Sequence, residues 1–181
     1  MSFDPTEMDG LFIGKRNPIS NGLGDLTRFY CNEELKKIGI NSSICQINKT
    51  LTNKIGSIRG MHFQLYPYQE DKIVSCLKGI IFDVAIDIRR NSSTFLNYHA
   101  EILSEKNNKF MCIPKGFAHG FQSLSDCCEV LYFHTEFYSS KFERGIRWDD
   151  KSININWPLA PSKISERDMK HKIITKEFQG I

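Results

Sequence analysis

A succession of short apolar runs, each closed by a turn, is the feature that most limits what this chain can fold into. From Lys72 onward the runs are KIVSCLKG, IIFDVAIDIRR, NYHAEILSE, NKFMCIPKG, HGFQSLSD and CCEVLYFHTEFYS. Runs rich in Ile, Val, Phe and Tyr and interrupted by Lys-Gly, Lys-Asn-Asn or Ser-Asp are typical of β-strands joined by hairpins. The sequence therefore predicts an all-β fold, an antiparallel sandwich or barrel.

The segments before and after this region complete the expected architecture. FDPTEMDGLFIG and SSICQINKTLT are further strand candidates, while CNEELKKIG has helix formers that end at a glycine. The tail APSKISERDMKHK is more polar, and we expect a short helix and a loop that lie over the body. A chain of 181 residues without internal repeats fits one domain, and we expect that domain to span 1–181.

Charge and hydropathy exclude several classes of protein. The net charge is only +3, and the Lys and Arg residues are scattered among nearly as many acids, so no basic face for nucleic acid is expected. No apolar run approaches the roughly eighteen residues of a membrane span, and the start MSFDPTEMDG lacks the pattern of a signal peptide. The sequence predicts a soluble, cytoplasmic protein without a membrane partner.

The cysteines form no CxxC pair, and several of them fall inside strand-like runs. In a chain with no export signal, free and buried thiols are the better interpretation than disulfides. The residues concerned are Cys31, Cys45, Cys76, Cys112, Cys127 and Cys128.

One strand carries acidic residues in a regular pattern. In IIFDVAIDI, Asp83 and Asp87 share one alternation phase, and the other phase is apolar (Phe82, Val84, Ile86, Ile88). Acidic side chains on one face of a strand indicate either a solvated outer face, which is the default, or a polar barrel interior.

Two stretches, RGMHFQ and IPKGFAHGF, each place one histidine among apolar residues and glycine. His62 and His119 could be metal ligands, a base with a substrate contact, or packed imidazoles. IPKGFAHGF resembles the second motif of the cupin superfamily, which has a jelly-roll fold. A metal-binding cupin would have a second histidine in the first motif, where this chain has Gln64. We therefore expect a site with no metal and no cofactor.

A closer resemblance covers most of the chain. Between Cys45 and Pro158 the segments GSIRGMHFQ, DKIVSCLKGIIFDVAIDIRR, IPKGFAHGFQSLS, VLYFHTEFYSSKFERGIRWDD and ININWP occur in order, and SERD follows in the tail. Together they resemble the dTDP-4-dehydrorhamnose 3,5-epimerase (RmlC-like) family. The resemblance implies a cupin jelly roll, the double-stranded β-helix, with short peripheral helices and an N-terminal dimerisation arm.

The chemistry of this family sets clear requirements. To invert a carbon next to a ketone, an enzyme needs a base, a stabiliser for the enolate and an acid on the opposite face. The resemblance implies that His62 is the base and that Asp168 fixes its tautomer. It also implies that Tyr132 is the proton donor and that Lys72 is the cation near the C4 oxygen of the sugar.

The resemblance also implies a set of binding residues for a nucleotide-diphosphate sugar. Arg59 and His119 match contacts to the diphosphate or the sugar, and Gln46 and Asn48 match a polar pair facing the nucleotide. Glu143 and Arg167 match two further nucleotide contacts, although Arg167 replaces the usual lysine with a planar fork of donors.

Two departures from the family affect the residues that read the base. The usual N-terminal D-x-R-G-x-F stretch is replaced by GDLTRFYCNEEL, in which Arg28 is the candidate substitute. Phe137 aligns with the tyrosine that stacks on thymine and keeps only the π-face. The sequence therefore leaves open a dTDP-linked 4-keto-6-deoxy sugar or a GDP-linked 4-keto hexose or heptose, and inversion at C3, C5 or both.

Other functions stay open at this level. A sugar-nucleotide 3,4-ketoisomerase, a non-catalytic sugar-binding cupin and a metal-dependent cupin enzyme share the fold. For the leading epimerase interpretation we expect a product used in surface polysaccharides such as capsule or lipopolysaccharide. We also expect a homodimer, because antiparallel sheets have edges to cover and the GDLTRF region is where family members exchange a strand.

Overall fold

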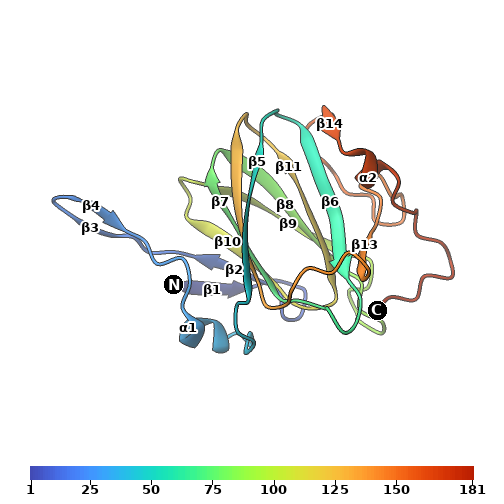
Figure 1. The fold of residues 1–181 in the computed structure, drawn as a ribbon, viewed down its shortest axis with the longest axis horizontal. Coiled ribbons are helices and arrows are strands. Elements are labelled where there is room, and N and C mark those ends of the chain that lie inside the picture. The colour runs from blue at the N-terminus through green and yellow to red at the C-terminus, as the bar shows by residue number, and fades with distance from the viewer.

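Two sheets packed face to face form the body of the protein in a computed structural model that describes residues 1–181 (Figure 1). Neighbouring strands in the first sheet are antiparallel. In spatial order this sheet contains β1 (Ser2–Pro5), β2 (Phe12–Lys15), β10 (Lys109–Ile113), β7 (Lys72–Lys78), β12 (Cys128–His134) and β5 (Gln46–Thr52).

The second sheet is antiparallel along its main path, with one short parallel addition. Its order is β13 (Glu143–Gly145), β6 (Ser57–Gln64), β11 (Phe117–Ser123), β8 (Ile80–Asp87) and β9 (Tyr98–Ser104), and β14 (Lys163–Ile164) pairs with β6 in parallel. The predicted all-β fold of antiparallel sheets is confirmed.

The remaining elements are short. A hairpin of β3 (Ile19–Asn21) and β4 (Gly24–Leu26) projects from the body, as Figure 1 shows. The helices are α1 (Asn32–Lys36), in the predicted CNEELKKIG segment, and α2 (Glu166–Met169), in the predicted tail. Neither has the length and apolar character that a membrane-crossing helix needs.

Apolar side chains are buried in three places. The largest cluster fills the space between the sheets and includes Val74, Ile81, Met111 and Phe121. A second cluster lies on the outer face of the second sheet, where the C-terminal tail covers it, and a third lies beneath α1 on the outer face of the first sheet. Because both sheets are covered on both faces, their central strands carry few exposed side chains.

Because both faces of the second sheet are covered, the default expectation of a solvated face on β8 has to be corrected. Asp83 and Asp87 on β8 are both 0% exposed, so the expected solvated face is wrong. Ile81 and Ala85, in the same alternation phase, belong to the cluster between the sheets, while Val84 faces the tail. The sequence of β8 alone could not reveal that a distant segment covers the other face.

The two histidine-containing stretches lie side by side. His62 on β6 and His119 on β11 are register partners, and two glycines lie next to them. A Cβ on Gly60, whose φ is +129°, would lie 2.5 Å from Gly120 Cα, so the two backbones approach more closely than side chains would allow. The glycines in RGMHFQ and IPKGFAHGF therefore permit the strand contact that brings the two imidazoles together.

All six cysteines are free thiols. Cys76, Cys112 and Cys128 are buried as expected, whereas Cys45 and Cys127 are exposed and Cys31 is half-buried. The expectation of burial is therefore wrong for three of them, which lie outside the central strands.

Asp87 is a buried acid whose charge is satisfied by hydrogen bonds. Its Oδ2 accepts from Arg89 at 2.7 Å, from Ser92 Oγ at 2.6 Å and from Thr94 Oγ1 at 2.7 Å. Burial acts to raise the pKa of Asp87, but the hydrogen bonds from Arg89, Ser92 and Thr94 outweigh it and lower the pKa to about 2. The ionised form therefore stabilises the fold.

We expect Asp87→Asn to lower the free energy of unfolding at pH 7 by on the order of 2 kcal/mol, given an unfolded pKa of about 3.9. Because the folded pKa is depressed, this contribution is complete above about pH 4 and is lost as the pH falls toward 2. Urea unfolding at pH 7, 4 and 3 measures it. The matched control is Asp149→Asn, which removes an exposed partner of Arg147 and should change stability by less than ~1 kcal/mol. A wild-type pH profile in the Asp87 variant would contradict the assignment.

Candidate active site

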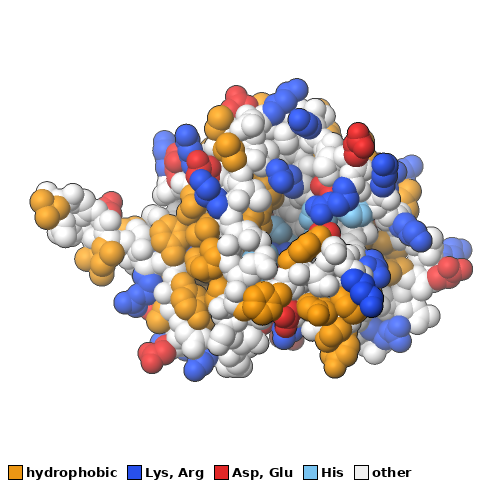
Figure 2. Space-filling model, viewed as in Figure 1, with side chains coloured by type: hydrophobic (Ala, Val, Ile, Leu, Met, Phe, Trp, Pro, Cys, Tyr) orange, Lys and Arg blue, Asp and Glu red, His pale blue; other side chains and the backbone are white.

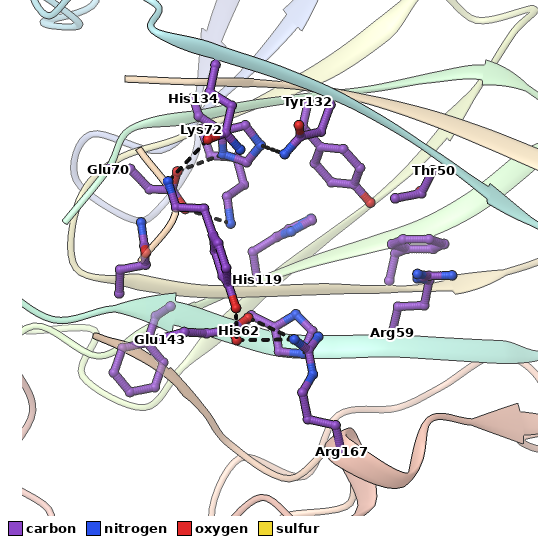
Figure 3. Close-up of a pocket in the computed structure, with 16 residues that line it drawn as sticks. Thr50, Arg59, His62, Glu70, Lys72, His119, Tyr132, His134, Glu143 and Arg167 are labelled. Atoms are coloured by element: carbon purple, nitrogen blue, oxygen red, sulfur yellow. Dashed lines mark hydrogen bonds and ion pairs between the residues drawn. The ribbon is translucent and has the colours of Figure 1, made fainter. Parts of the chain in front are cut away.

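A polar pocket opens between the two sheets. The first sheet contributes side chains from β5, β7 and β12, the second from β6, β11 and β13, and the α2 segment contributes one more (Figure 3). Figure 2 shows histidine side chains in this hollow with Lys and Arg side chains around it. The lining residues are Gln46, Asn48, Thr50, Arg59, His62, Phe63, Gln64, Glu70, Lys72, His119, Phe121, Tyr132, His134, Tyr138, Glu143 and Arg167.

His62 on β6 is paired with a carboxylate from the tail. Its Nε2 lies 2.8 Å from Asp168 Oδ1, and the imidazole is partly exposed in the pocket while the carboxylate is buried behind it. When Nε2–H donates to Asp168, the free lone pair of the ring is on Nδ1. The structure thus brings two predicted residues together as an imidazole–carboxylate pair.

Local structure fixes the carboxylate. Asp168 lies in the first turn of α2, where Ser165 Oγ accepts its N–H at 3.1 Å as an N-cap, and its Oδ2 accepts from the Gly60 N–H at 3.2 Å. Burial acts to raise the pKa of Asp168, but the hydrogen bond and charge of His62 and the Gly60 N–H hold it well below the usual range. Asp168 therefore stays ionised and orients the ring.

Tyr132 lies on the opposite wall. It belongs to β12 in the first sheet, whereas His62 belongs to β6 in the second, and Figure 3 shows the two side chains across the pocket from each other. Burial raises the pKa of Tyr132 well above its ordinary value, so the phenol keeps its proton at neutral pH. The pocket therefore presents a lone pair on one side and a transferable proton on the other.

Lys72 is part of a polar cluster that the sequence did not predict. Glu70 Oε1 lies 3.3 Å from Lys72 Nζ, and Glu70 Oε2 accepts from His134 Nδ1 at 2.6 Å. His134 Nε2 in turn lies 3.4 Å from the Asn48 amide nitrogen, and its ring stacks on Tyr132. The sequence did offer one signal for these two residues. Glu70 lies two positions before Lys72 and His134 lies two positions after Tyr132, and side chains two positions apart in a strand point to the same face.

His119 lies deeper, on β11. It is buried, and its Nε2 donates to Asp83 Oδ1 at 2.8 Å. Burial lowers the pKa of His119, although Asp83 acts in the opposite direction. The predicted contact residue therefore has a fixed orientation, and the acidic strand supplies its partner. Arg59 also lines the pocket, as predicted.

The rim of the pocket is closed by an ion pair. Arg167 NH1 lies 3.2 and 3.1 Å from the two oxygens of Glu143, and Tyr138 OH donates to Glu143 at 3.0 Å. The same guanidinium lies 3.1 Å from His62 Nε2. Gln46 Oε1, also lining the pocket, accepts from the Tyr138 N–H at 3.2 Å. The predicted residues Gln46, Glu143 and Arg167 thus lie together.

Gln64 occupies the position where a metal-binding cupin has its second histidine. Its amide nitrogen donates to the carbonyls of Tyr68 and Phe137, and its oxygen accepts from the Ser139 N–H at 2.7 Å. The side chain is engaged with three backbone groups, so it holds the loop after β12 in place and offers no donor to a cupin-type metal.

Two of the predicted binding residues do not line the pocket of this chain. Arg28 follows the projecting hairpin and forms an exposed pair with Glu34 at 3.4 Å. Phe137 is 59% exposed and lies beside Tyr138, which does line the pocket. A contact of either residue with a nucleotide stays a prediction.

The arrangement is suited to moving a proton at a carbon next to a carbonyl. A base and an acid lie on opposite walls, and cationic side chains lie among them. Proton removal on one side and return on the other inverts a carbon, and a nearby cation stabilises the oxyanion formed in between.

Comparison with known proteins places these features in context. Residues 5–176 match the family described as dTDP-4-dehydrorhamnose 3,5-epimerase. The epimerase of that name from Shigella flexneri is 46% identical over 132 residues, covering 73% of this chain and 72% of the relative. The one from Methanothermobacter thermautotrophicus is 37% identical over 173 residues, covering 94% and 92%.

Solved structures agree over nearly the whole chain. The dTDP-4-dehydrorhamnose 3,5-epimerase of Bacillus anthracis, with TDP and PPi bound, superimposes with a TM-score of 0.92 at 31% identity, covering 96% of this chain and 99% of that one. The enzyme RmlC of Legionella pneumophila, in complex with dTDP-4-keto-L-rhamnose, gives 0.90 at 33% identity, covering 95% and 92%.

Proposed function

The chain belongs to the dTDP-4-dehydrorhamnose 3,5-epimerase family, and from this premise we propose that it inverts C3 and C5 of a dTDP-linked 4-keto-6-deoxy sugar. It is an epimerase, an isomerase that acts on carbohydrates. The observation that carries the proposal is the His62–Asp168 pair facing Tyr132 across one pocket. The product would supply a rhamnose-type sugar for surface polysaccharides.

The geometry supports a stepwise mechanism. Nδ1 of His62 removes the proton from the carbon next to the C4 ketone, while Asp168 stabilises the imidazolium that forms. Lys72 stabilises the enolate oxygen, and Tyr132 returns a proton to the opposite face of the carbon. The same groups then act on the second carbon next to the ketone.

The binding residues are assigned by their position in the pocket. Arg59 and His119 hold the diphosphate or the sugar, and Gln46 and Asn48 on β5 face the nucleotide. Arg167 and Glu143 close the rim over it. The ligands of both solved relatives carry thymidine diphosphate in their names, which favours dTDP over the GDP alternative.

Incubation with dTDP-4-keto-6-deoxyglucose in D2O, followed by NMR, tests this function. We expect deuterium to enter at C3 and at C5 with inversion, and a GDP-linked 4-keto sugar to react far more slowly. Deuterium at one carbon only would restrict the proposal to a single inversion. Formation of a 3-keto product would instead support the ketoisomerase alternative, and absence of any exchange would support the sugar-binding one.

We also propose that the active form is a homodimer. The projecting hairpin exposes Ile19 by 67%, Leu23 by 99% and Leu26 by 68%, and Figure 2 shows its apolar side chains standing clear of the body. β5 is an edge strand and exposes Ile47 by 58%. A second copy would cover both surfaces. The same contact would carry Arg28, which follows the hairpin, toward the partner.

Replacing two apolar residues of the hairpin should separate the dimer. We expect the double variant Leu23→Asp and Leu26→Asp to weaken association by at least ~100-fold, because each leucine contributes roughly 2 kcal/mol when buried. Light scattering at micromolar concentration measures the mass. The control is Ile173→Asp, which changes an exposed apolar residue in the tail and should leave the mass unchanged. A monomeric wild-type protein would contradict the proposal.

A further inference from the structure

A second imidazole approaches the catalytic carboxylate from the tail. His62, Asp168 and His171 each offer one ligand atom, and the three atoms lie within 4.8 Å of one another. Asp168 Oδ1 is the shared centre, 2.8 Å from His62 Nε2 and 3.6 Å from His171 Nε2. The proton-transfer scheme uses the first contact and leaves His171 without a role.

His171 has an unexplained buried nitrogen. Its Nε2 is inaccessible to solvent and has no hydrogen-bond partner, and its ring lies edge-on to His62 with centroids 5.4 Å apart. The ring fills the space that a side chain at Gly145 would need. A buried polar atom without a protein partner is uncommon, and a bound ion or water would satisfy it.

We propose that His62, Asp168 and His171 form an inhibitory site for a divalent transition metal, with Zn²⁺ as the best match. Two imidazole nitrogens and one carboxylate oxygen are ligands that Zn²⁺ prefers, whereas Mg²⁺ prefers oxygen alone. Ligand atoms around tetrahedral zinc lie ~3.3 Å apart when the bonds are ~2.0–2.1 Å long. The two distances to Asp168 Oδ1 lie on either side of this value.

Metal binding here would switch off the base. Zn²⁺ takes the lone pair of His62 Nε2, so the proton that Nε2 donated to Asp168 leaves that atom, and the neutral ring carries its proton on Nδ1 instead. Nδ1 then has no lone pair for the sugar, and no electron transfer or net proton loss is involved. The metal acts by fixing the wrong tautomer.

Arg167 determines how readily the metal enters. Its guanidinium lies 3.1 Å from His62 Nε2, so its charge opposes a cation at that position. The side chain is 55% exposed and can move into solvent. Binding should therefore be reversible and weaker than at a buried structural zinc site.

The test uses binding and activity as separate readouts. Titration of the whole protein with Co²⁺, followed by visible absorption, should give the band of a low-coordinate site in the wild type and none in His171→Asn. This binding result does not depend on the proposed function. In the epimerisation assay, which does, Zn²⁺ should inhibit the wild type, and His171→Asn should keep its activity and need ~10-fold or more Zn²⁺ for half-inhibition.

Matched variants separate this site from other metal-binding groups. His99→Asn removes an imidazole whose Nε2 is also buried and unpartnered, but which pairs with Glu7 outside the pocket, and it should leave inhibition unchanged. The double variant Cys45→Ser and Cys127→Ser removes the exposed thiols and should also stay sensitive. Equal Zn²⁺ sensitivity in folded His171→Asn and His171→Ala, a wild-type protein without a Co²⁺ band, or protection by the cysteine variant would overturn the proposal.

Discussion

His62→Asn is expected to abolish exchange of the C3 and C5 protons with D2O while nucleotide binding stays nearly unchanged. The imidazole is assigned to proton removal, and the amide that replaces it has no comparable basicity. Diphosphate and nucleotide are assigned to other side chains, so the loss should appear in kcat rather than in affinity. We expect a fall in rate of at least ~10² to 10⁴, the usual contribution of a general base.

NMR in D2O gives the exchange rate, and calorimetric titration with dTDP gives the affinity. His99→Asn serves as the control, because it makes the same chemical change outside the pocket and should keep full activity. If His62→Asn still brought deuterium into the sugar at near the wild-type rate, His62 would not be the base.

Tyr132→Phe is expected to separate proton removal from inversion. The base would remain, so deuterium could still enter by return of a proton from the His62 side with retention of configuration. Net epimerisation should fall by ~10² to 10⁴, because the enolate would lack a donor on the opposite face. Exchange and inversion are measured in the same sample, by deuterium content and by the configuration of the product.

Tyr138→Phe provides the matched comparison. Its hydroxyl donates to Glu143 at the rim, so its removal should affect nucleotide binding more than inversion. Equal loss of exchange and inversion in Tyr132→Phe would mean that the phenol supports the geometry of His62 or the enolate. Full epimerisation in that variant would leave Tyr138 or water as the donor.

The strands and the short helices could be predicted from the sequence because they depend on local alternation and on turn residues. The burial of Asp83 and Asp87 could not, since these side chains share the face of β8 that packs toward the first sheet, and the strand's own sequence does not reveal that contact. The exposed Cys45 was misassigned for a related reason, because strand-like composition does not reveal which strand forms an edge. The single-domain organisation stays a prediction.

The candidate site was predictable where separate motifs agreed with a family. Glu70 was missed because it lies just outside those motifs, and His134 was missed because no role was assigned to it within the motif that also carries Tyr132. Each lies two residues from a predicted site residue. His171 was missed because its proximity to His62 arises only when the tail folds back against β6. Contacts of this kind depend on tertiary structure and leave no local pattern.

The distance in sequence between the base and its carboxylate also affects how activity arises during synthesis. His62 leaves the ribosome 106 residues before Asp168, and the tail that carries Asp168 also covers the apolar outer face of the second sheet. A nascent, nicked or truncated chain without that tail lacks the orienting carboxylate and leaves this face open to water. The complete imidazole–carboxylate pair is therefore formed late in synthesis, and chains that expose this apolar face also lack the orienting carboxylate.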